Sequence, residues 1–390
     1  MMLGFLLARA GIDVVVLEKH ADFLRDFRGD TIHPSTMQVM DELGLLDEFL
    51  KLPHEKVRTL TARFGDTEVL MADFSHLPVR APFIAMMPQW DFLNFLAAHA
   101  KTFPTFRLLM STEATGLLTD PDRVVGIRAR VANGGGEIEV RAPLTVAADG
   151  RTSTLRQASG LKVEDFGAPM DVLWFRLPRE PSDTDQTQAR FDAGRIFIML
   201  NRGDYWQCAF VILKGRNEQI RATGLDAFRE ALRPILFDPR RADAITSWDQ
   251  IKLLTVQVNR LTKWWKPGLL CIGDAAHAMS PIGGVGVNLA IQDAVAAANI
   301  LAEPLRTGRV GTEHLAAVQR RREWPTRVTQ HLQLLIQKRV IAPTLAKTGK
   351  IKPPLVFRLM TRFPIFSRLT ARVIGLGVRP EHVAVPQRRG

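Results

Sequence analysis

The segment from Leu269 to Asp293 constrains the fold more than any other part of the chain. An apolar run over 269–272 leads into Gly273 and Asp274, and the turn PIGGVGVN over 281–288 leads into an alanine-rich stretch. This order predicts a buried strand ending at a carboxylate, a turn in which the backbone approaches a ligand closely, and a helix over 286–302 that Pro304 ends. The positive N-terminal end of that helix would face the ligand, so the segment predicts a binding site.

The N-terminal residues have the pattern of half a βαβ unit. Residues 2–10 show helical spacing, Gly11 can cap that helix, and IDVVVL over 12–17 is typical of a strand buried on both faces. Glu18 closes the strand, where dinucleotide-binding units place an acidic residue that accepts hydrogen bonds from ribose hydroxyls. A solvated charge at a strand end is the alternative interpretation of Glu18.

The G-x-G-x-x-G turn that precedes such a helix in dinucleotide-binding units does not occur before residues 2–10. We expect a strand and that turn, about 10–15 residues, to precede Met1 in the active form. The alternative is a natural short form, weakly stable because its neighbouring strands would keep unpaired edges.

Segments with helical spacing and segments with strand patterns alternate along the rest of the chain. Further helices are expected over 35–50, 91–103 and 312–323 and after Pro325. Hairpin signals occupy 57–74 and 124–148, and aromatic alternation over 166–266 predicts mainly antiparallel strands. The α/β texture returns at Gly268, so we predict an α/β domain interrupted by a second, strand-rich domain.

The positive charge is concentrated near one end. The net charge is +12, but 319–390 holds 16 Lys and Arg against Glu323 and Glu381, a local excess of 14, which leaves −2 for the first 318 residues. A nearly neutral body with a basic tail argues against nucleic-acid binding. Cys208 and Cys271 lie in apolar runs and are expected to be reduced core thiols of a cytoplasmic protein. No run of 18 uncharged apolar residues occurs, so no membrane-spanning helix is predicted.

These motifs together resemble the flavin-dependent aromatic hydroxylases of the p-hydroxybenzoate hydroxylase fold. The segment 271–294 is similar to the family's GD motif, whose aspartate, here Asp274, binds the FAD ribityl chain. ADGRTSTLR over 148–156 resembles the DG motif, in which Asp149 and Gly150 would contact FAD and the nicotinamide cofactor. Taken alone, Asp149 and Gly150 favour an ordinary turn. Arg28 and Gln89 stand where the family has an arginine and a glutamine that reach FAD. For each of these two residues, an ordinary loop or cap role is the alternative.

The resemblance implies a fold and a division into domains. It implies a Rossmann-like FAD-binding domain over 1–56, 86–165 and 267–327. A mainly antiparallel substrate domain would cover 57–85 and 166–266, and a helical, basic C-terminal tail 328–390.

The resemblance also implies a reaction. NADH or NADPH would reduce FAD, O2 would form a C4a-hydroperoxide, and a small aromatic or hydrophobic substrate would be hydroxylated, with the cofactor carrying the difficult chemistry. Pro281 would line the reacting edge, and Gly284 would belong to the cofactor-binding turn. Backbone N–H groups from Gly286 through Val287 to Asn288 would stabilise charge on the reduced flavin. We expect His277 to pack or hydrogen-bond rather than to titrate in catalysis.

Other functions fit the sequence less well. A flavin oxidoreductase that inserts no oxygen, or a scaffold that has lost FAD, remain alternatives. Halogenases share the fold, but their W-x-W signature is absent, since Trp264 and Trp265 are adjacent. No metal site is predicted, because no His or Cys pair has zinc-site spacing. Tyr205 is the only tyrosine and matches no catalytic motif.

The C-terminal segment over 355–376 permits one more interaction. Leu355, Leu359, Phe363 and Phe366 alternate with arginines there, a pattern that allows contact with the inner membrane surface at anionic lipid. Packing of this segment on the protein, with its arginines in water, is the simpler expectation, and Pro364 interrupts the helix.

Overall fold

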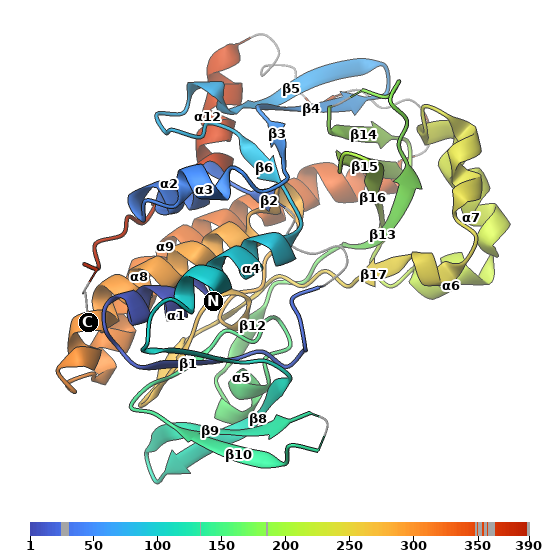
Figure 1. Cartoon of the computed structure of the whole chain (residues 1–390). Coiled ribbons are helices and arrows are strands. Elements are labelled where there is room, and N and C mark those ends of the chain that lie inside the picture. Colours follow the sequence, from blue (N-terminus) through green and yellow to red (C-terminus); the bar gives the residue numbers. More distant parts are fainter. Residues whose placement is uncertain are drawn as a thin grey trace.

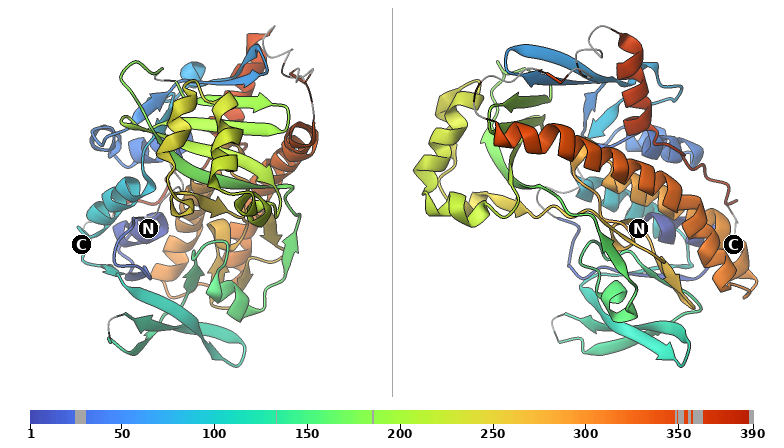
Figure 2. Two further views of the ribbon diagram at one scale, coloured as in Figure 1. Left: turned by 90° about the vertical axis from the view of Figure 1, so that its right-hand side faces the viewer. Right: turned by 180° about the vertical axis from the view of Figure 1, so that it is seen from behind.

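The structure is a computed structural model, and it describes residues 1–24, 31–132, 134–184, 186–347, 349, 353–354, 357 and 363–387. Its elements form three regions (Figures 1 and 2). Helices surround the N-terminus in the middle, a small antiparallel sheet lies at one end, and a large sheet with further helices lies at the other.

Two pairs of parallel strands lie in the middle region. β1 (Val14–Leu17) pairs with β7 (Phe106–Leu109), and β11 (Thr145–Ala147) pairs with β20 (Leu269–Cys271), to which β19 (Trp265–Lys266) adds an antiparallel edge. The predicted mixed α/β class is therefore confirmed. Among the described residues the two pairs belong to separate sheets, so the Rossmann-like arrangement stays a prediction.

Four long helices pack around these strands. They are α1 (Met2–Arg9), α4 (Gln89–Ala100), α8 (Gly286–Arg306) and α9 (Thr312–Ile336). α1 packs on both α4 and α8, and one apolar core joins them to β20. The stretch Ile282–Arg306 has the length and apolar composition of a membrane span, but 67% of its most apolar window is buried inside the protein, as in a core helix.

The large sheet has seven strands in the order β17-β13-β16-β15-β14-β4-β5. All neighbours are antiparallel except β14 and β4. The bounds are β4 (Thr59–Phe64), β5 (Thr67–Asp73), β13 (Met170–Pro178), β14 (Gln188–Asp192), β15 (Arg195–Asn201), β16 (Tyr205–Leu213) and β17 (Lys252–Leu254). Phe175, Phe197 and Cys208 pack with Phe228 and Leu232 of α7 (Leu225–Leu232), which follows α6 (Asn217–Ala222). The strands of the large sheet come from the two ranges predicted to form a substrate domain, 57–85 and 166–266. The assignment of this region as a substrate domain stays a prediction.

The remaining elements include the small antiparallel sheet, in the order β10-β9-β8, and the segments that connect the three regions. The remaining strands are β2 (Thr31–Ile32), β3 (Glu55–Val57), β6 (Ile84–Met86), β8 (Thr112–Asp120), β9 (Arg123–Val131), β10 (Glu137–Arg141), β12 (Val163–Asp165) and β18 (Asn259–Leu261). The remaining α-helices are α2 (Pro34–Glu42), α3 (Leu46–Phe49), α5 (Thr154–Ser159), α10 (Ala342–Ala346) and α12 (Pro364–Gly375). Single turns are η1 (Phe74–His76), η2 (Arg233–Ile235), η3 (Pro239–Ala244), η4 (Trp248–Gln250), η5 (Gly273–Ala275), η6 (Ile282–Gly284) and the π-helical η7 (Gln337–Ile341).

The structure corrects three predicted helix boundaries. Pro304 does not end α8, which continues to Arg306, and Pro325 lies inside α9 rather than between two helices. A proline removes one helical N–H, but packing of α8 against α9 holds both helices together across that loss. The helix predicted over 35–50 is instead two, α2 and α3, because the chain turns at Gly44 with a positive φ of 73°.

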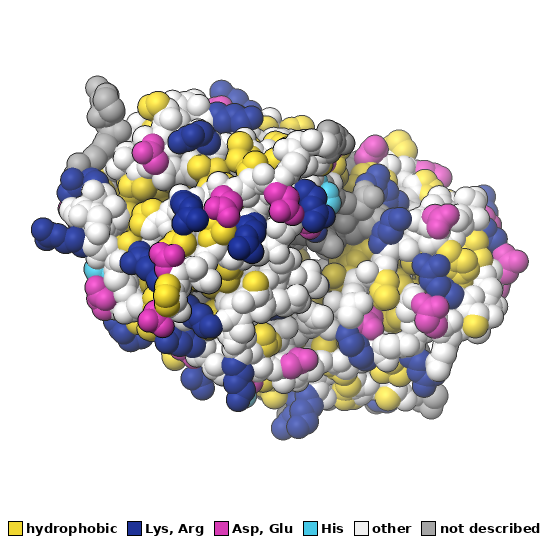
Figure 3. Space-filling view, turned by 90° about the horizontal axis from the view of Figure 1, so that it is seen from below, with side chains coloured by type: hydrophobic (Ala, Val, Ile, Leu, Met, Phe, Trp, Pro, Cys, Tyr) yellow, Lys and Arg dark blue, Asp and Glu magenta, His cyan; other side chains and the backbone are white. Residues whose placement is uncertain are grey.

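The described C-terminal residues are not a loose tail. Ser367 and Ala371 of α12 are buried where the helix packs on β5 and η1, and the extended residues 379–387 lie across α2 and α8. We call residues 379–387 the C-terminal strap. Its Val385 accepts a hydrogen bond from Arg9 of α1 at 2.8 Å. On the face in Figure 3, basic and acidic side chains are interspersed.

Both cysteines belong to the core, as predicted. Cys208 on β16 and Cys271 at the end of β20 are buried and free. Burial raises the pKa of the Cys271 thiol to about 12, so it stays protonated near neutral pH.

Candidate functional site

The turn after β20 presents one carboxylate to solvent. Asp274 lies in η5, and its side chain is 31% exposed. Nη2 of Arg151, from the predicted DG motif, lies 3.8 Å from its Oδ2. Arg156 is buried and donates to the backbone oxygens of Ala275 (3.2 Å) and Arg151 (2.5 Å). The structure thus brings the predicted GD and DG motifs together.

Within the DG motif, Asp149 is engaged locally. Its carboxylate accepts hydrogen bonds from the Ser153 hydroxyl and from the backbone N–H of Leu155 at 3.2 Å, which caps the start of α5. Gly150 turns the chain with φ of 85°. The cofactor roles of Asp149 and Gly150 stay predictions.

The glycines before α8 shape an open turn. Gly284 has φ of 63°, and a Cβ placed there would lie 2.5 Å from Oγ1 of Thr31, whose hydroxyl donates to the Gly284 carbonyl at 3.0 Å. A Cβ at Gly286, by contrast, would meet no other heavy atom within 4 Å. Gly284 is therefore required by the protein itself, whereas the space beside Gly286 is available to a ligand.

Asn288 fixes the segment on the other side of this turn. Its Oδ1 accepts the backbone N–H of His33 and the hydroxyl of Thr36, both at 2.8 Å, and its Nδ2 donates to Thr31 O at 3.1 Å and to Gly284 O at 3.3 Å. The buried side chain is thus fully used within the protein. A cofactor role for Asn288 would therefore fall to its backbone N–H, as predicted.

A buried ion network lies behind the turn. His277 Nε2 is 2.5 Å from Oδ2 of Asp293, which also accepts the Gly273 N–H at 3.0 Å, and Arg322 Nε donates to the other Asp293 oxygen at 3.0 Å. Arg322 reaches Glu381 of the C-terminal strap at 3.1 Å. His277 thus hydrogen-bonds as predicted, whereas Arg322 and Glu381 were missed, because no local pattern links them to the motif.

Charge balance holds this network together. Burial alone would raise the pKa of the Asp293 carboxyl, but His277 and Arg322 outweigh burial, and its pKa lies below the usual value. Asp293 therefore stays ionised and keeps its acceptor for the Gly273 N–H. This fixes the turn that carries Asp274.

The remaining predicted residues are placed as follows. Glu18 follows β1, and its Oε1 accepts the His20 N–H at 3.0 Å. Gln89 is the half-buried first residue of α4. Pro281 and Val287 are half-buried on either side of η6. Arg28 lies outside the described residues. None of these positions establishes or contradicts a cofactor role.

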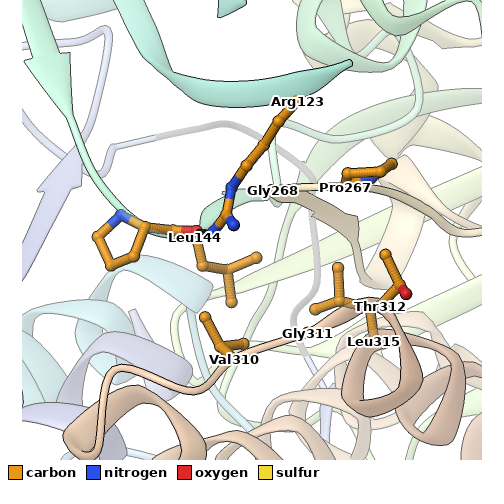
Figure 4. Close-up of a pocket in the computed structure, with 9 residues that line it drawn as sticks. Arg123, Leu144, Pro267, Gly268, Val310, Gly311, Thr312 and Leu315 are labelled. Carbon is orange, nitrogen blue, oxygen red and sulfur yellow. Dashed lines mark hydrogen bonds between the residues drawn. The ribbon is translucent and has the colours of Figure 1, made fainter. Parts of the chain in front are cut away.

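A pocket of about 130 Å³ lies elsewhere (Figure 4). Arg123, Pro267, Gly268 and Thr312 are among its lining residues. Gly268 precedes β20, whereas Asp274 follows it, so the pocket lies at the opposite end of that strand. Ligands of parallel α/β folds bind at the carboxyl ends of strands, and we assign this pocket no role.

The arrangement fits FAD. The first backbone N–H groups of α8 have no partners within the helix and form its positive end, which suits the electron-rich edge of a flavin. Asp274 offers two acceptors for sugar hydroxyls, and the space beside Gly286 leaves room for a flat ring. These features fit the FAD site of a flavoprotein.

The chain belongs to the FAD binding domain family, which it matches over residues 1–331. It is 30% identical to the 6-methylpretetramide 4-monooxygenase of Streptomyces rimosus, covering 95% of this chain and 88% of that protein. It is 28% identical to the 3-(3-hydroxy-phenyl)propionate/3-hydroxycinnamic acid hydroxylase of Escherichia coli K12, covering 75% of this chain but only 52% of the relative. The family and these relatives support an FAD-dependent oxidoreductase, with NAD(P)H as the co-substrate typical of the family.

Solved structures share the fold. The anhydrotetracycline hydroxylase OxyS of Streptomyces rimosus is similar with a TM-score of 0.75 and 22% identity, covering 97% of this chain and 74% of that one. The flavin-dependent halogenase CmlS and the Diels-Alderase PyrE3 are also similar, each with a TM-score of 0.72. The fold alone therefore does not choose among these chemistries.

Proposed function

We propose that this protein hydroxylates a small aromatic or hydrophobic substrate, using FAD, NADH or NADPH, and O2. The observation that carries the proposal is the geometry of 271–293, in which Asp274, the open turn at Gly286 and the start of α8 fit FAD. Relatives named as hydroxylases of aromatic compounds support it. A flavin oxidoreductase without oxygen insertion and a scaffold without FAD are the alternatives.

Each residue has a proposed task. Asp274 and Glu18 accept hydrogen bonds from hydroxyls of the cofactor, and Arg28, Gln89 and the DG motif contact its remaining polar groups. The N–H groups at the start of α8 stabilise negative charge on the reduced ring. When bound, FAD supplies hydride acceptance and the activation of O2 at flavin C4a. The protein orients the substrate and excludes water.

The apolar surroundings of the turn support a hydrophobic substrate. Ile282, next to Pro281, packs with a cluster from the large sheet and α10 that includes Val172, Ile196 and Leu345. Tyr205, at the start of β16, lies under the Arg176 guanidinium, whose centre is 4.7 Å from the ring centroid. We propose that the substrate binds between Pro281 and this sheet.

Isotope labelling tests the proposal. Purified protein with FAD, NADH or NADPH, and labelled dioxygen should incorporate one labelled atom into a phenolic substrate, and that substrate should accelerate flavin reduction. Label found only in water or peroxide across a panel of substrates would support the oxidoreductase alternative. Protein without flavin absorbance after FAD loading would support the scaffold.

A membrane contact is a further part of the proposal, for a cytoplasmic protein that binds the inner membrane surface. Ile365, Phe366 and Leu369 of α12 are 70%, 43% and 56% exposed beside the exposed Arg368 and Arg372. Apolar side chains flanked by arginines suit an anionic lipid surface.

Vesicle binding tests this contact. The protein should co-sediment with phosphatidylserine-containing vesicles but not with phosphatidylcholine alone, and Leu369→Asp should abolish binding. Leu253→Asp, at an exposed leucine of β17, serves as the matched control. Equal sedimentation of Leu369→Asp and the unchanged protein would rule out α12 as the contact.

A further inference from the structure

The face of α9 that meets the rest of the protein is polar. Six side chains at intervals of three or four residues lie on one side of the helix and its π-helical continuation, and all are buried: Gln319, Arg322, Thr326, Gln330, Gln333 and Gln337. An inward helix face is normally apolar. In Figure 2 this helix crosses the molecule from the middle region to the large sheet.

Gln333 holds both sides of Pro281. Its Oε1 accepts the backbone N–H of Ser280 at 3.1 Å, and its Nε2 donates to the carbonyls of Ser280 (2.9 Å) and Ile282 (2.8 Å). Gln337 Nε2 donates to the Ser280 hydroxyl at 2.8 Å. One side chain therefore makes three hydrogen bonds to the two residues that flank Pro281.

The segment needs such a partner. Residues 278–281 belong to no helix or strand, Ser280 is buried, and Pro281 has no N–H of its own. Buried backbone groups without secondary structure require a side chain or water as partner. Gln333 provides it from a helix, whose position is set by packing on α8.

We propose that Gln333 is a positioning residue that fixes Pro281 relative to FAD and so keeps water from the reacting edge. The three hydrogen bonds of Gln333 support its role in positioning Pro281. The effect of Gln333 on catalysis rests on the proposed function. Supporting residues that lock a site in place govern how precisely it acts. Without these hydrogen bonds, a larger share of the NAD(P)H that is oxidised should therefore yield hydrogen peroxide instead of hydroxylated product.

Gln319 offers a matched control on the same helix face. It also makes three hydrogen bonds, accepting the Trp264 N–H at 3.0 Å and donating to Thr262 O at 3.1 Å and to Glu323 at 3.2 Å. It is buried like Gln333. Its backbone partners, Thr262 and Trp264, precede β20, whereas those of Gln333 lie in 280–282, so the same substitution removes similar bonds from a different segment.

The experiment compares Gln333→Met with Gln319→Met in the FAD-loaded and FAD-free protein. Methionine has a similar volume, has no donor, and replaces the amide oxygen with a weakly accepting sulfur. Gln333→Met should speed amide hydrogen exchange in the peptide 278–284 about tenfold and weaken FAD binding. It should also raise the share of NAD(P)H that ends as peroxide. Gln319→Met should lower the melting temperature similarly but change none of these three quantities.

The outcomes separate the inference from the proposed function. Unchanged exchange over 278–284 in Gln333→Met, or the same increase in Gln319→Met, would overturn the positioning role. If the unchanged protein oxidises no NAD(P)H, the proposed function fails, and exchange and FAD affinity still decide the role of Gln333. If Gln333→Met does not fold, Gln333→Glu replaces it, because glutamate keeps the acceptor for Ser280 and, protonated in this buried site, has one donor for two carbonyls.

Discussion

Gly284 and Gly286, at the turn before α8, constrain the protein for different reasons. Gly284 needs its positive φ and its contact with Thr31, whereas nothing in the protein crowds a Cβ at Gly286. We expect Gly286→Val to leave the stability of the FAD-free protein within about 1 kcal/mol and to weaken FAD binding tenfold or more, because the new methyl groups occupy the ring's space. Flavin fluorescence titration and urea unfolding measure both.

Gly284→Ala is the comparison for that test. It should destabilise the FAD-free protein itself, since its Cβ would lie 2.5 Å from the Thr31 hydroxyl. If Gly286→Val binds FAD normally, the flavin ring does not lie beside Gly286.

His33 should make stability depend on pH. Burial lowers its pKa to about 4 from 6.5, although its contact with the Ile374 carbonyl at 2.8 Å acts in the opposite sense. The folded protein thus favours the neutral ring. The free energy of unfolding should be highest above pH 6.5 and fall by roughly 3 kcal/mol as the pH drops from 6.5 to about 4.

The variant His33→Asn should lose this part of the pH dependence, because asparagine can donate to Ile374 without titrating. Urea unfolding across the same pH range measures it, with His76→Asn as a control at an exposed histidine. Parallel curves for His33→Asn and the unchanged protein would show that another group is responsible.

At the scale of elements, the C-terminal strap is held by charge. Arg321 and Arg322 both donate to the buried carboxylate of Glu381, at 2.7 and 3.1 Å. Glu381→Ala should lower the free energy of unfolding by roughly 3 kcal/mol, because among the residues that the structure describes it leaves the buried Arg322 with Asp293 alone as an acidic partner. Glu303→Ala, which breaks an exposed pair with Arg306, should cost under about 1 kcal/mol.

Thermal unfolding and limited proteolysis of the strap distinguish the two variants. Equal stability of Glu381→Ala and Glu303→Ala would mean that the strap is held by its backbone contacts alone.

Local patterns predicted most elements well. The alternation and turn residues of 57–74 predicted β4 and β5, and the β-branched run after Gly11 predicted β1. The helix ends predicted from Pro304 and Pro325 were wrong. A proline in the sequence indicates a lost helical hydrogen bond, but the packing that offsets this loss is visible only in the structure. Likewise, the polar face of α9 is typical of a helix face exposed to water. In the structure its side chains instead hydrogen-bond to residues of 259–282.

At the scale of the molecule, sequence patterns could not predict which distant segments meet. The pairs Arg322 with Glu381 and His33 with Ile374 join residues 59 and 341 positions apart. The basic excess after residue 318 predicts a basic tail, and part of that charge neutralises Asp293 and Glu381 inside the protein. A net charge describes how many ions a segment carries and not where they lie.

The strap also sets an order of events during synthesis. Arg9 of α1 binds the carbonyl of Val385, 376 residues later, and at 5–20 residues per second a ribosome needs roughly 20 to 75 s to make the chain between them. Arg322 emerges from the ribosome before Glu381, its carboxylate partner in the strap. The 59 residues between Arg322 and Glu381 take roughly 3 to 12 s to make at that rate, so the strap supplies the last carboxylate of this ion network.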